Sequence, residues 1–206
     1  RVRRGPPQNI TGAIPLCRKA CDLGGVEGCF DLGLMLVRSG RTGAEPIFAK
    51  ACQDGFARAC ALHGSLLLKG DDAKVSQART AFEKACQAGV QVACVDLGGM
   101  LDDGPGDVKN PERAVALFSK ACASGLVVGC VKLGLMLSSG RGVAKDTARA
   151  MTFFKGACQA GEPRGCYRLG LAYKRGVGVD VNHEEGRRLL AKACRQGYRR
   201  ACASLD

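Results

Sequence analysis

Apolar and small residues recur along the chain at spacings that indicate short amphipathic helices. Four Phe residues share one position, four residues before a Cys and so one helical turn away on the same face: Phe48, Phe82, Phe118 and Phe154. That face is predicted to be the core. Three residues after each such Cys stands a Gly, the residue that ends a helix most readily because it adopts left-handed geometry. The pattern therefore predicts a series of short helices, each ended by Gly.

Polar capping residues indicate where the first helix of each pair begins. Asn110 followed by Pro111 is typical of an N-cap and a first helical position, and Ser76, Asp146 and Asn182 stand at equivalent places. First helices are therefore predicted at 77–88, 111–124, 147–160 and 183–196. A second helix follows each of these after a turn of a few residues. It ends near a Gly such as Gly104, Gly140 or Gly176.

Twelve of the 13 cysteines form six pairs whose members are eight residues apart. The pairs are Cys21/Cys29, Cys52/Cys60, Cys86/Cys94, Cys122/Cys130, Cys158/Cys166 and Cys194/Cys202. Successive pairs begin 31, 34, 36, 36 and 36 residues apart. A period of this length predicts an all-α solenoid of about six helix-turn-helix units. After a basic tail at 1–11, the solenoid is expected over 12–206, with units near 12–40, 41–70, 75–105, 110–141, 146–177 and 182–206.

The paired cysteines are predicted to form one disulfide in each unit. One member lies in the last turn of the first helix and the other in the first turns of the second helix, so the short turn brings them face to face. Each disulfide closes a loop of about nine residues, worth about 2.5 kcal/mol by chain entropy. Zinc binding by these thiolates is the alternative, although structural zinc sites favour shorter Cys spacings. No metal or cofactor is predicted.

Cys17 has no partner in this scheme. It stands at the position that Phe occupies in other units, one turn before Cys21. A buried thiol that packs as a small apolar side chain is one interpretation. An intermolecular disulfide, or exchange with Cys21, is the other.

The charge distribution suggests an anionic partner. The net charge is +12, and residues 141–206 carry +8 of it, with 14 Lys and Arg against 6 Asp and Glu. A Lys stands two residues before the first Cys of five units: Lys19, Lys50, Lys84, Lys120 and Lys192. This lysine column either complements the negative ends of the first helices or forms a positive stripe for an acidic partner. Nucleic acid is disfavoured, because aromatic residues that could stack on bases are only 5% of the chain.

The segments LGLMLSSGRGVAKDTARAMTFFKGACQAG (133–161) and LGLAYKRGVGVDVNHEEGRRLLAKACRQG (169–197) resemble Sel1-like repeats. The eight-residue Cys pairing is similar to that of the Helicobacter cysteine-rich protein (Hcp-like) family. The resemblance implies a right-handed α/α superhelix, secreted or periplasmic, that binds peptides or proteins; weak binding or hydrolysis of β-lactams is also implied. Two departures are the shortened stretch SGRTGAEP (39–46), which predicts a short first helix in the second unit, and Cys17 in place of Phe.

Enzymatic chemistry finds little support in the residues themselves. None of the eight Ser residues has a Lys three positions later, so the S-x-x-K arrangement of serine β-lactamases is absent. His63 and His183, the two histidines, stand in no zinc-hydrolase motif and are expected to be structural or solvated. We therefore expect a scaffold that binds a protein or an extended, acidic peptide through the first-helix face. A weak β-lactamase-like protein remains the alternative. No apolar run is long enough to span a membrane, and a chain that opens at Arg1 without Met is expected to be processed, its signal peptide already removed.

Overall fold

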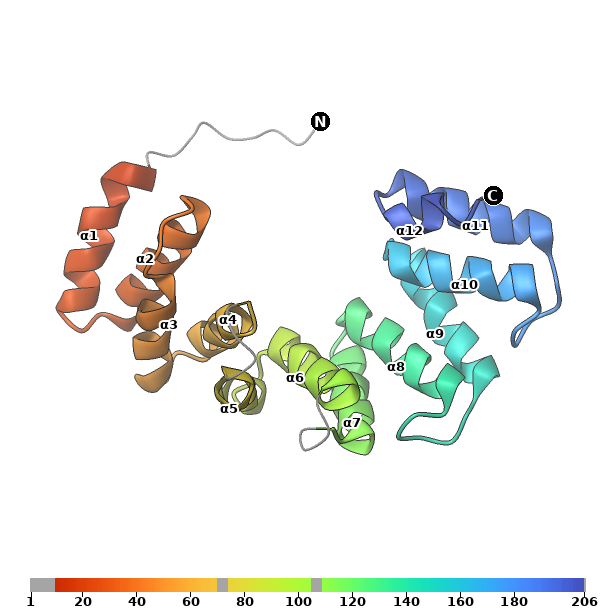
Figure 1. Ribbon diagram of the computed structural model, residues 1–206, viewed down its shortest axis with the longest axis horizontal. Helices are drawn as coiled ribbons and strands as arrows, with labels where there is room; N and C mark the ends of the chain where they lie inside the picture. Colours follow the sequence, from red (N-terminus) through yellow and green to blue (C-terminus); the bar gives the residue numbers. More distant parts are fainter. Residues whose placement is uncertain (1–9, 70–73, 105–108, 206) are drawn as a thin grey trace. The chain divides into compact units, whose positions relative to one another are not determined.

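The computed structural model describes residues 10–69, 74–104 and 109–205, which are helical with short turns and contain no strand (Figure 1). Most of the basic tail predicted at 1–11 lies outside the described residues. So do residues 70–73 and 105–108, between predicted units. The chain divides into two compact units, residues 1–93 and 94–206.

Helices follow one another in antiparallel pairs within each unit. The first unit holds α1 (Ile10–Asp22), α2 (Val26–Arg38), α3 (Ala44–Gln53), α4 (Ala57–Leu67) and α5 (Val75–Gln87), and α6 (Gln91–Asp103) begins at its end. The second unit holds most of α6, then α7 (Pro111–Ala123), α8 (Val127–Ser139), α9 (Thr147–Gln159), α10 (Pro163–Arg175), α11 (His183–Arg195) and α12 (Arg199–Cys202). The predicted all-α repeat fold is confirmed, and the helix ends agree with prediction to within a few residues.

Three of the four predicted N-caps are confirmed. The side chains of Asn110, Asp146 and Asn182 each accept a hydrogen bond from the backbone N–H three residues later, at 2.9 Å. The prediction for Ser76 is wrong, because α5 begins at Val75 and Ser76 lies inside it. The residue before this helix is Lys74, which makes no side-chain capping bond; its Nζ lies 3.0 Å from Oε2 of Glu45 on α3.

The predicted disulfides are present in the structure. The Cα atoms of the cysteines in five pairs lie 4.4–4.8 Å apart: Cys21–Cys29, Cys52–Cys60, Cys122–Cys130, Cys158–Cys166 and Cys194–Cys202. Cys86 and Cys94 are also disulfide-bonded. Each bond joins the end of one helix to the start of the next, because a Gly three residues after the first Cys reverses the chain. In Gly125, for example, φ is +84°.

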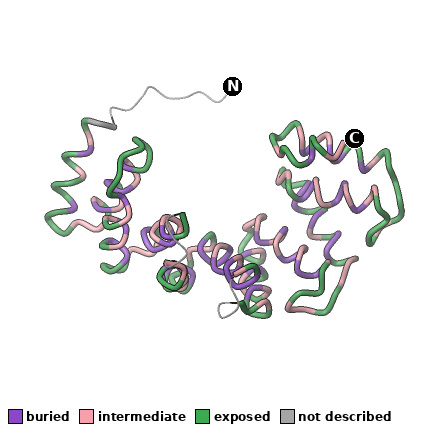
Figure 2. The backbone as a smooth tube through the Cα atoms, viewed as in Figure 1, coloured by how far each residue is buried: buried purple, intermediate pink, exposed green. Residues whose placement is uncertain are grey.

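The core is a column of Phe side chains that lie over Gly residues of the preceding helix. Phe48, Phe82, Phe118 and Phe154 are at most 2% exposed (Figure 2 shows the buried positions along each helix). A Cβ added to Gly33, Gly64, Gly98 or Gly134 would lie 2.5–2.9 Å from a ring atom of the next Phe. The Phe ring of the following repeat therefore packs directly against the Gly four residues after the second Cys.

The outer face of α1 is not covered in the same way. Cys17 is free and half-exposed, whereas the equivalent Phe side chains are buried. Leu16 on the same helix and Leu23, just after its end, are 72% and 80% exposed. The interpretation of Cys17 as a buried thiol is therefore wrong for this structure. No described helix precedes α1, so no described Gly packs against Cys17 as one does against each Phe ring.

Candidate ligand-binding groove

The second helices of three successive repeats line a basic cavity of about 510 Å³ in the second unit. Five cationic side chains surround it: Lys132 on α8, Arg164 and Arg168 on α10, and Arg199 and Arg200 on α12. Val128, Val131 and Leu135 of α8 form an apolar wall. Among the residues that the structure describes, no acidic side chain lines this cavity. Its volume is within the range of ordinary ligand pockets.

The repeat places four of these five cations at two fixed positions. Lys132 and Arg168 stand two residues after the second Cys of their units, and Arg164 and Arg200 stand two residues before it. Residues four apart lie on one helical face, so Arg164 and Arg168 project from the same side of α10. Because successive units are related by the same 36-residue period, the cations of neighbouring helices come together.

Aromatic rings support Arg168 at the α10–α12 end. The rings of Tyr167 and Tyr198 pack with centroids 5.1 Å apart, and Cζ of Arg168 lies 5.7 Å from the Tyr167 ring centroid. Such contacts limit the freedom of the guanidinium, which lowers the entropy cost of binding an anion. Four of the five cations are Arg, whose planar fork can bind a carboxylate through two hydrogen bonds.

A second cavity, of about 470 Å³, continues the first and brings in acidic groups. The two share Lys132, Leu135, Arg168 and Arg200. The second adds Asp102 and Asp103, which are both bound by Arg141: Nη2 lies 2.9 Å from Asp102 Oδ2, and Nη1 lies 3.2 Å from Asp103 Oδ1.

Asp102 is the unusual member of this cavity. It is 3% exposed, and its Oδ1 is buried without a hydrogen-bond partner among the described residues. Burial raises the pKa of Asp102, and the charge of Arg141 opposes that shift. The pKa of Asp96, nearby on α6, is also raised by burial, with Lys132 opposing. For each of these two carboxyl groups on α6, the nearby cations therefore offset only part of the cost of burying a charge.

A third, apolar cavity of about 120 Å³ adjoins the other two. Met151, Phe154, Leu171, Ala172 and Val177 contribute its apolar lining. Leu135 and Arg168 line all three cavities. We call the three together the α8–α10 groove. Cations line each of the three cavities, and Asp102 and Asp103 of α6 line the second.

The lysine column lies elsewhere, at the ends of the first helices. Lys50 Nζ donates to the carbonyl of Cys21 at 3.3 Å, and Lys192 Nζ donates to the carbonyl of Cys158 at 3.0 Å. Each of these carbonyls is at the end of the preceding first helix, so the two lysines join successive repeats. Lys19, Lys84 and Lys120 are exposed. Their role as a binding stripe stays a prediction.

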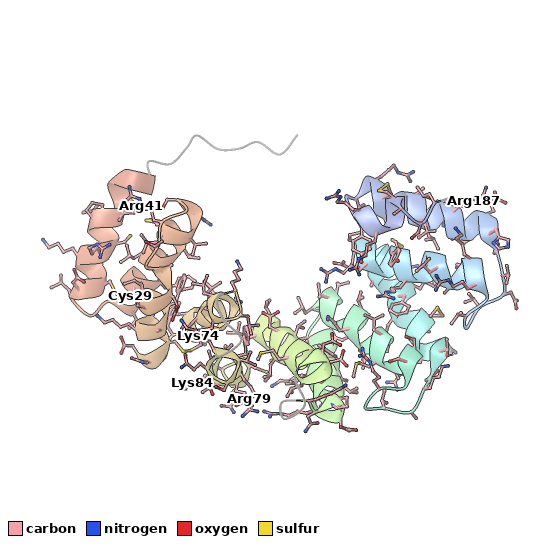
Figure 3. The ribbon with its side chains drawn as sticks, in the orientation of Figure 1. Cys29, Arg41, Lys74, Arg79, Lys84 and Arg187 are labelled. Carbon is pink, nitrogen blue, oxygen red and sulfur yellow. A yellow bond between two sulfur atoms is a disulfide. The ribbon has the colours of Figure 1, made fainter. Side chains whose placement is uncertain are left out.

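One cavity touches the column in the first unit. Lys84, labelled in Figure 3, lines a space of about 270 Å³ together with Cys52, Thr80 and His63. Burial lowers the pKa of His63, while Glu45, whose Oε1 lies 3.9 Å from His63 Nε2, opposes the shift. His183 is the exposed first residue of α11. Across the described ranges, no three His, Cys, Asp or Glu side chains are grouped as metal ligands.

The sequence interpretation missed the cations of the groove. It noted the positive charge of residues 141–206 but searched for a repeated position beside the first Cys. The position two residues after the second Cys carries Asp31, Leu62, Asp96, Lys132 and Arg168 in successive units. This position is acidic or apolar in the first three units and basic in the next two. That change along the chain could have indicated the basic cluster from the sequence alone.

A Sel1 repeat family model matches residues 3–25, 57–90, 91–126, 127–162 and 163–198. The chain belongs to the Sel1 repeat family. The matched segments from residue 57 onward each begin at a second helix. Three consecutive matched segments, 91–126, 127–162 and 163–198, contribute to the α8–α10 groove, and α12 follows the last of them.

Solved structures with the same fold come from several bacteria. A protective antigen of uropathogenic Escherichia coli, c5321, superposes with a TM-score of 0.80 at 25% identity over 96% of this Sel1 chain and 44% of the antigen. A Sel1 repeat protein from Oxalobacter formigenes gives 0.75 at 18% identity, with 93% and 86% covered. The chain thus spans less than half the length of the E. coli antigen. No curated protein matches the sequence.

The cysteine-rich relative is also among the solved structures. Helicobacter pylori cysteine-rich protein B is 30% identical over 62% of this Sel1 chain and 96% of its own, with a TM-score of 0.50. The resemblance to the Hcp-like family, noted from the Cys spacing, is thereby confirmed.

Proposed function

We propose that this Sel1 repeat protein is a scaffold that binds an acidic, extended segment of another protein in the α8–α10 groove. The observation that carries the proposal is the basic cavity, where five cations surround about 510 Å³ without an acidic side chain. Sel1 repeats generally mediate protein interactions, and a stack of helices offers a continuous surface to an extended chain.

Electrostatics and apolar burial have separate roles in this proposal. The arginines attract carboxylates over a distance of about one Debye length, roughly 8–10 Å at physiological salt, and so raise the association rate. The apolar wall of Val128, Val131 and Leu135 accepts an aliphatic side chain and slows dissociation. An acidic segment that carries an aliphatic residue can contact both the arginines and the apolar wall.

The disulfides support a compartment outside the cytoplasm. Structural disulfides form and persist in oxidising environments, such as the periplasm or the extracellular space. None of the described helices is long and apolar enough to cross a membrane. We therefore place the proposed interaction in the periplasm or outside the cell.

The lysine column remains a second proposed contact surface for the same kind of partner. Lys84 and Lys120 are exposed and can meet an acidic chain, whereas Lys50 and Lys192 also bond the preceding repeat. The alternative of a β-lactamase-like protein has no supporting observation: Ser138 and Ser139, which line the groove, donate their hydroxyl protons to backbone carbonyls of α8.

A titration with a labelled peptide tests the proposal. The probe is a short peptide rich in Glu with a single Leu, and its control has every Glu replaced by Gln. Fluorescence anisotropy should show saturable binding of the Glu peptide, weakened about ten-fold or more as salt rises from low to several times physiological strength, because several charge pairs are screened. Equal binding of both peptides, or none of either, contradicts the proposal.

A further inference from the structure

The cavity of about 510 Å³ has different chemistry on its two sides. The α8 side carries Val128, Val131 and Leu135, whereas α10 and α12 contribute arginines, and α10 lies between α8 and α12 (Figure 1). Val128 and Leu135 are half-buried, so part of each side chain is open to a ligand. Leu135 also lines the apolar cavity of about 120 Å³. A ligand in the groove therefore meets aliphatic side chains on one side and guanidinium groups on the other.

Lys132, the cation that α8 contributes to the cavity, has partners on α6 and α7. Its Nζ lies 5.9 Å from the centroid of the Phe118 ring on α7. Burial raises the pKa of Asp96 and of Asp102 on α6, and the charge of Lys132 opposes both shifts. A ring face and nearby carboxylates both stabilise an ammonium group. Carboxylates of a ligand are therefore attracted chiefly to the arginines of α10 and α12, and α8 offers mainly its apolar side chains.

The two sides have the same spacing along their helices. Arg164 and Arg168 are four residues apart on α10, which is about 6 Å along the helix axis. Val131 and Leu135 have the same spacing on α8, and the two helices run in the same direction because each is the second helix of its repeat. In an extended strand, side chains on one side recur about every 6.6 Å, and successive side chains point to opposite sides. One strand can therefore direct alternate side chains to the two rows.

We infer that the groove selects an extended segment in which acidic and aliphatic residues alternate, with the aliphatic side chains on α8 and the carboxylates on the arginines of α10 and α12. The inference rests on the proposed function and adds the order of the residues to it. An extended segment with its acidic residues in one block directs some of them to the apolar wall, where a carboxylate loses water without gaining a charged partner. An alternating segment of the same composition avoids that loss and binds more tightly.

Two labelled peptides of equal composition, blocked at both ends, test the inference: Glu-Leu-Glu-Leu-Glu and Leu-Leu-Glu-Glu-Glu. Both carry the same net charge, so a difference in affinity reports the order of the residues. The block peptide places one Leu among the arginines and one Glu against the apolar wall. Fluorescence anisotropy should therefore show about ten-fold tighter binding of the alternating peptide to the wild-type protein.

A substitution in the apolar wall gives a second test. Leu135→Gln keeps a side chain of similar length but removes the apolar contact, so the preference for the alternating peptide should fall to about two-fold or less. Val92→Gln is the matched control, because Val92 is 55% exposed on α6 and lines none of the three cavities of the groove. This variant should keep the preference of the wild-type protein.

The outcomes separate the inference from the proposed function. Equal affinity of the two peptides for the wild-type protein, or tighter binding of the block peptide, overturns the inference and leaves the scaffold proposal standing. A preference that Leu135→Gln leaves unchanged also overturns the inference alone. Failure of both peptides to bind overturns the inference together with the proposed function. The comparison on the wild-type protein holds even if Leu135→Gln does not fold.

Discussion

At the scale of single residues, the fit between repeats depends on the absence of a side chain. Gly134 lies under the ring of Phe154, and an added Cβ would come within 2.7 Å of a ring carbon. The phase of these Gly residues is visible in the sequence, and so is the phase of the Phe residues. Their contact is not visible, because it joins the second helix of one repeat to the first helix of the next.

Substitution of Gly134 by Ala should therefore destabilise the protein. Because the added methyl group would overlap the buried Phe154 ring, we expect the free energy of unfolding to fall by about 1–3 kcal/mol, as for other overpacked cores. Gly156→Ala is the matched control: this Gly lies inside α9 with no atom within 4 Å of the added Cβ. It should gain up to about 1 kcal/mol from helix propensity. Urea denaturation measures the free energy of unfolding of both variants. Equal effects of the two substitutions would contradict the close packing of Phe154 against Gly134.

The residues of the groove could not be identified from the sequence one position at a time. Arg164, Arg168 and Arg200 each look like ordinary surface residues in the sequence, since long cations on helices usually face solvent. The sequence does not indicate that Asp102 is buried, because a charged residue near the end of a helix is ordinarily exposed. Only the stacking of α6, α8, α10 and α12 places these side chains around shared cavities.

At the scale of elements, local chemistry sets most of the helix ends. Asn110, Asp146 and Asn182 cap their helices as predicted, because a side-chain oxygen satisfies a backbone N–H that has no helical partner. Ser76 does not, because α5 begins one residue earlier, at Val75, and Ser76 lies inside the helix. The shortened stretch at 39–46 was correctly expected to shorten a helix: α3 has 10 residues, where most others have 13.

Each helix pair is held by its own disulfide, so reduction should weaken every repeat. Each loop of about nine residues contributes roughly 2.5 kcal/mol, although the effects are not expected to add fully in a stack of repeats. We expect dithiothreitol to lower the melting temperature strongly. Alkylation under denaturing conditions should find one reactive thiol, Cys17, before reduction and 13 after it. An unchanged melting curve, or 13 thiols from the start, would show that the cysteines do not stabilise the fold.

At the scale of the whole molecule, positive charge is presented at two different surfaces. The lysine column follows the ends of the first helices, and two of its members bond the backbone of the preceding repeat. The α8–α10 groove combines a basic cluster with apolar walls and cavities of about 510, 470 and 120 Å³. Charge alone attracts many anions, whereas charge beside an apolar cavity selects among them.

The most direct test compares charge reversals of equal size on these two surfaces. Arg168→Glu with Arg200→Glu alters the groove, and Lys84→Glu with Lys120→Glu alters exposed lysines of the column by the same net charge. Both change the net charge of the protein by the same amount, so a difference in affinity for the Glu-rich peptide reports which surface lies near the bound peptide. We predict a loss of about ten-fold or more for the arginine pair and about two-fold or less for the lysine pair. The reverse order, with both variants folded, would contradict the placement of the binding site in the groove.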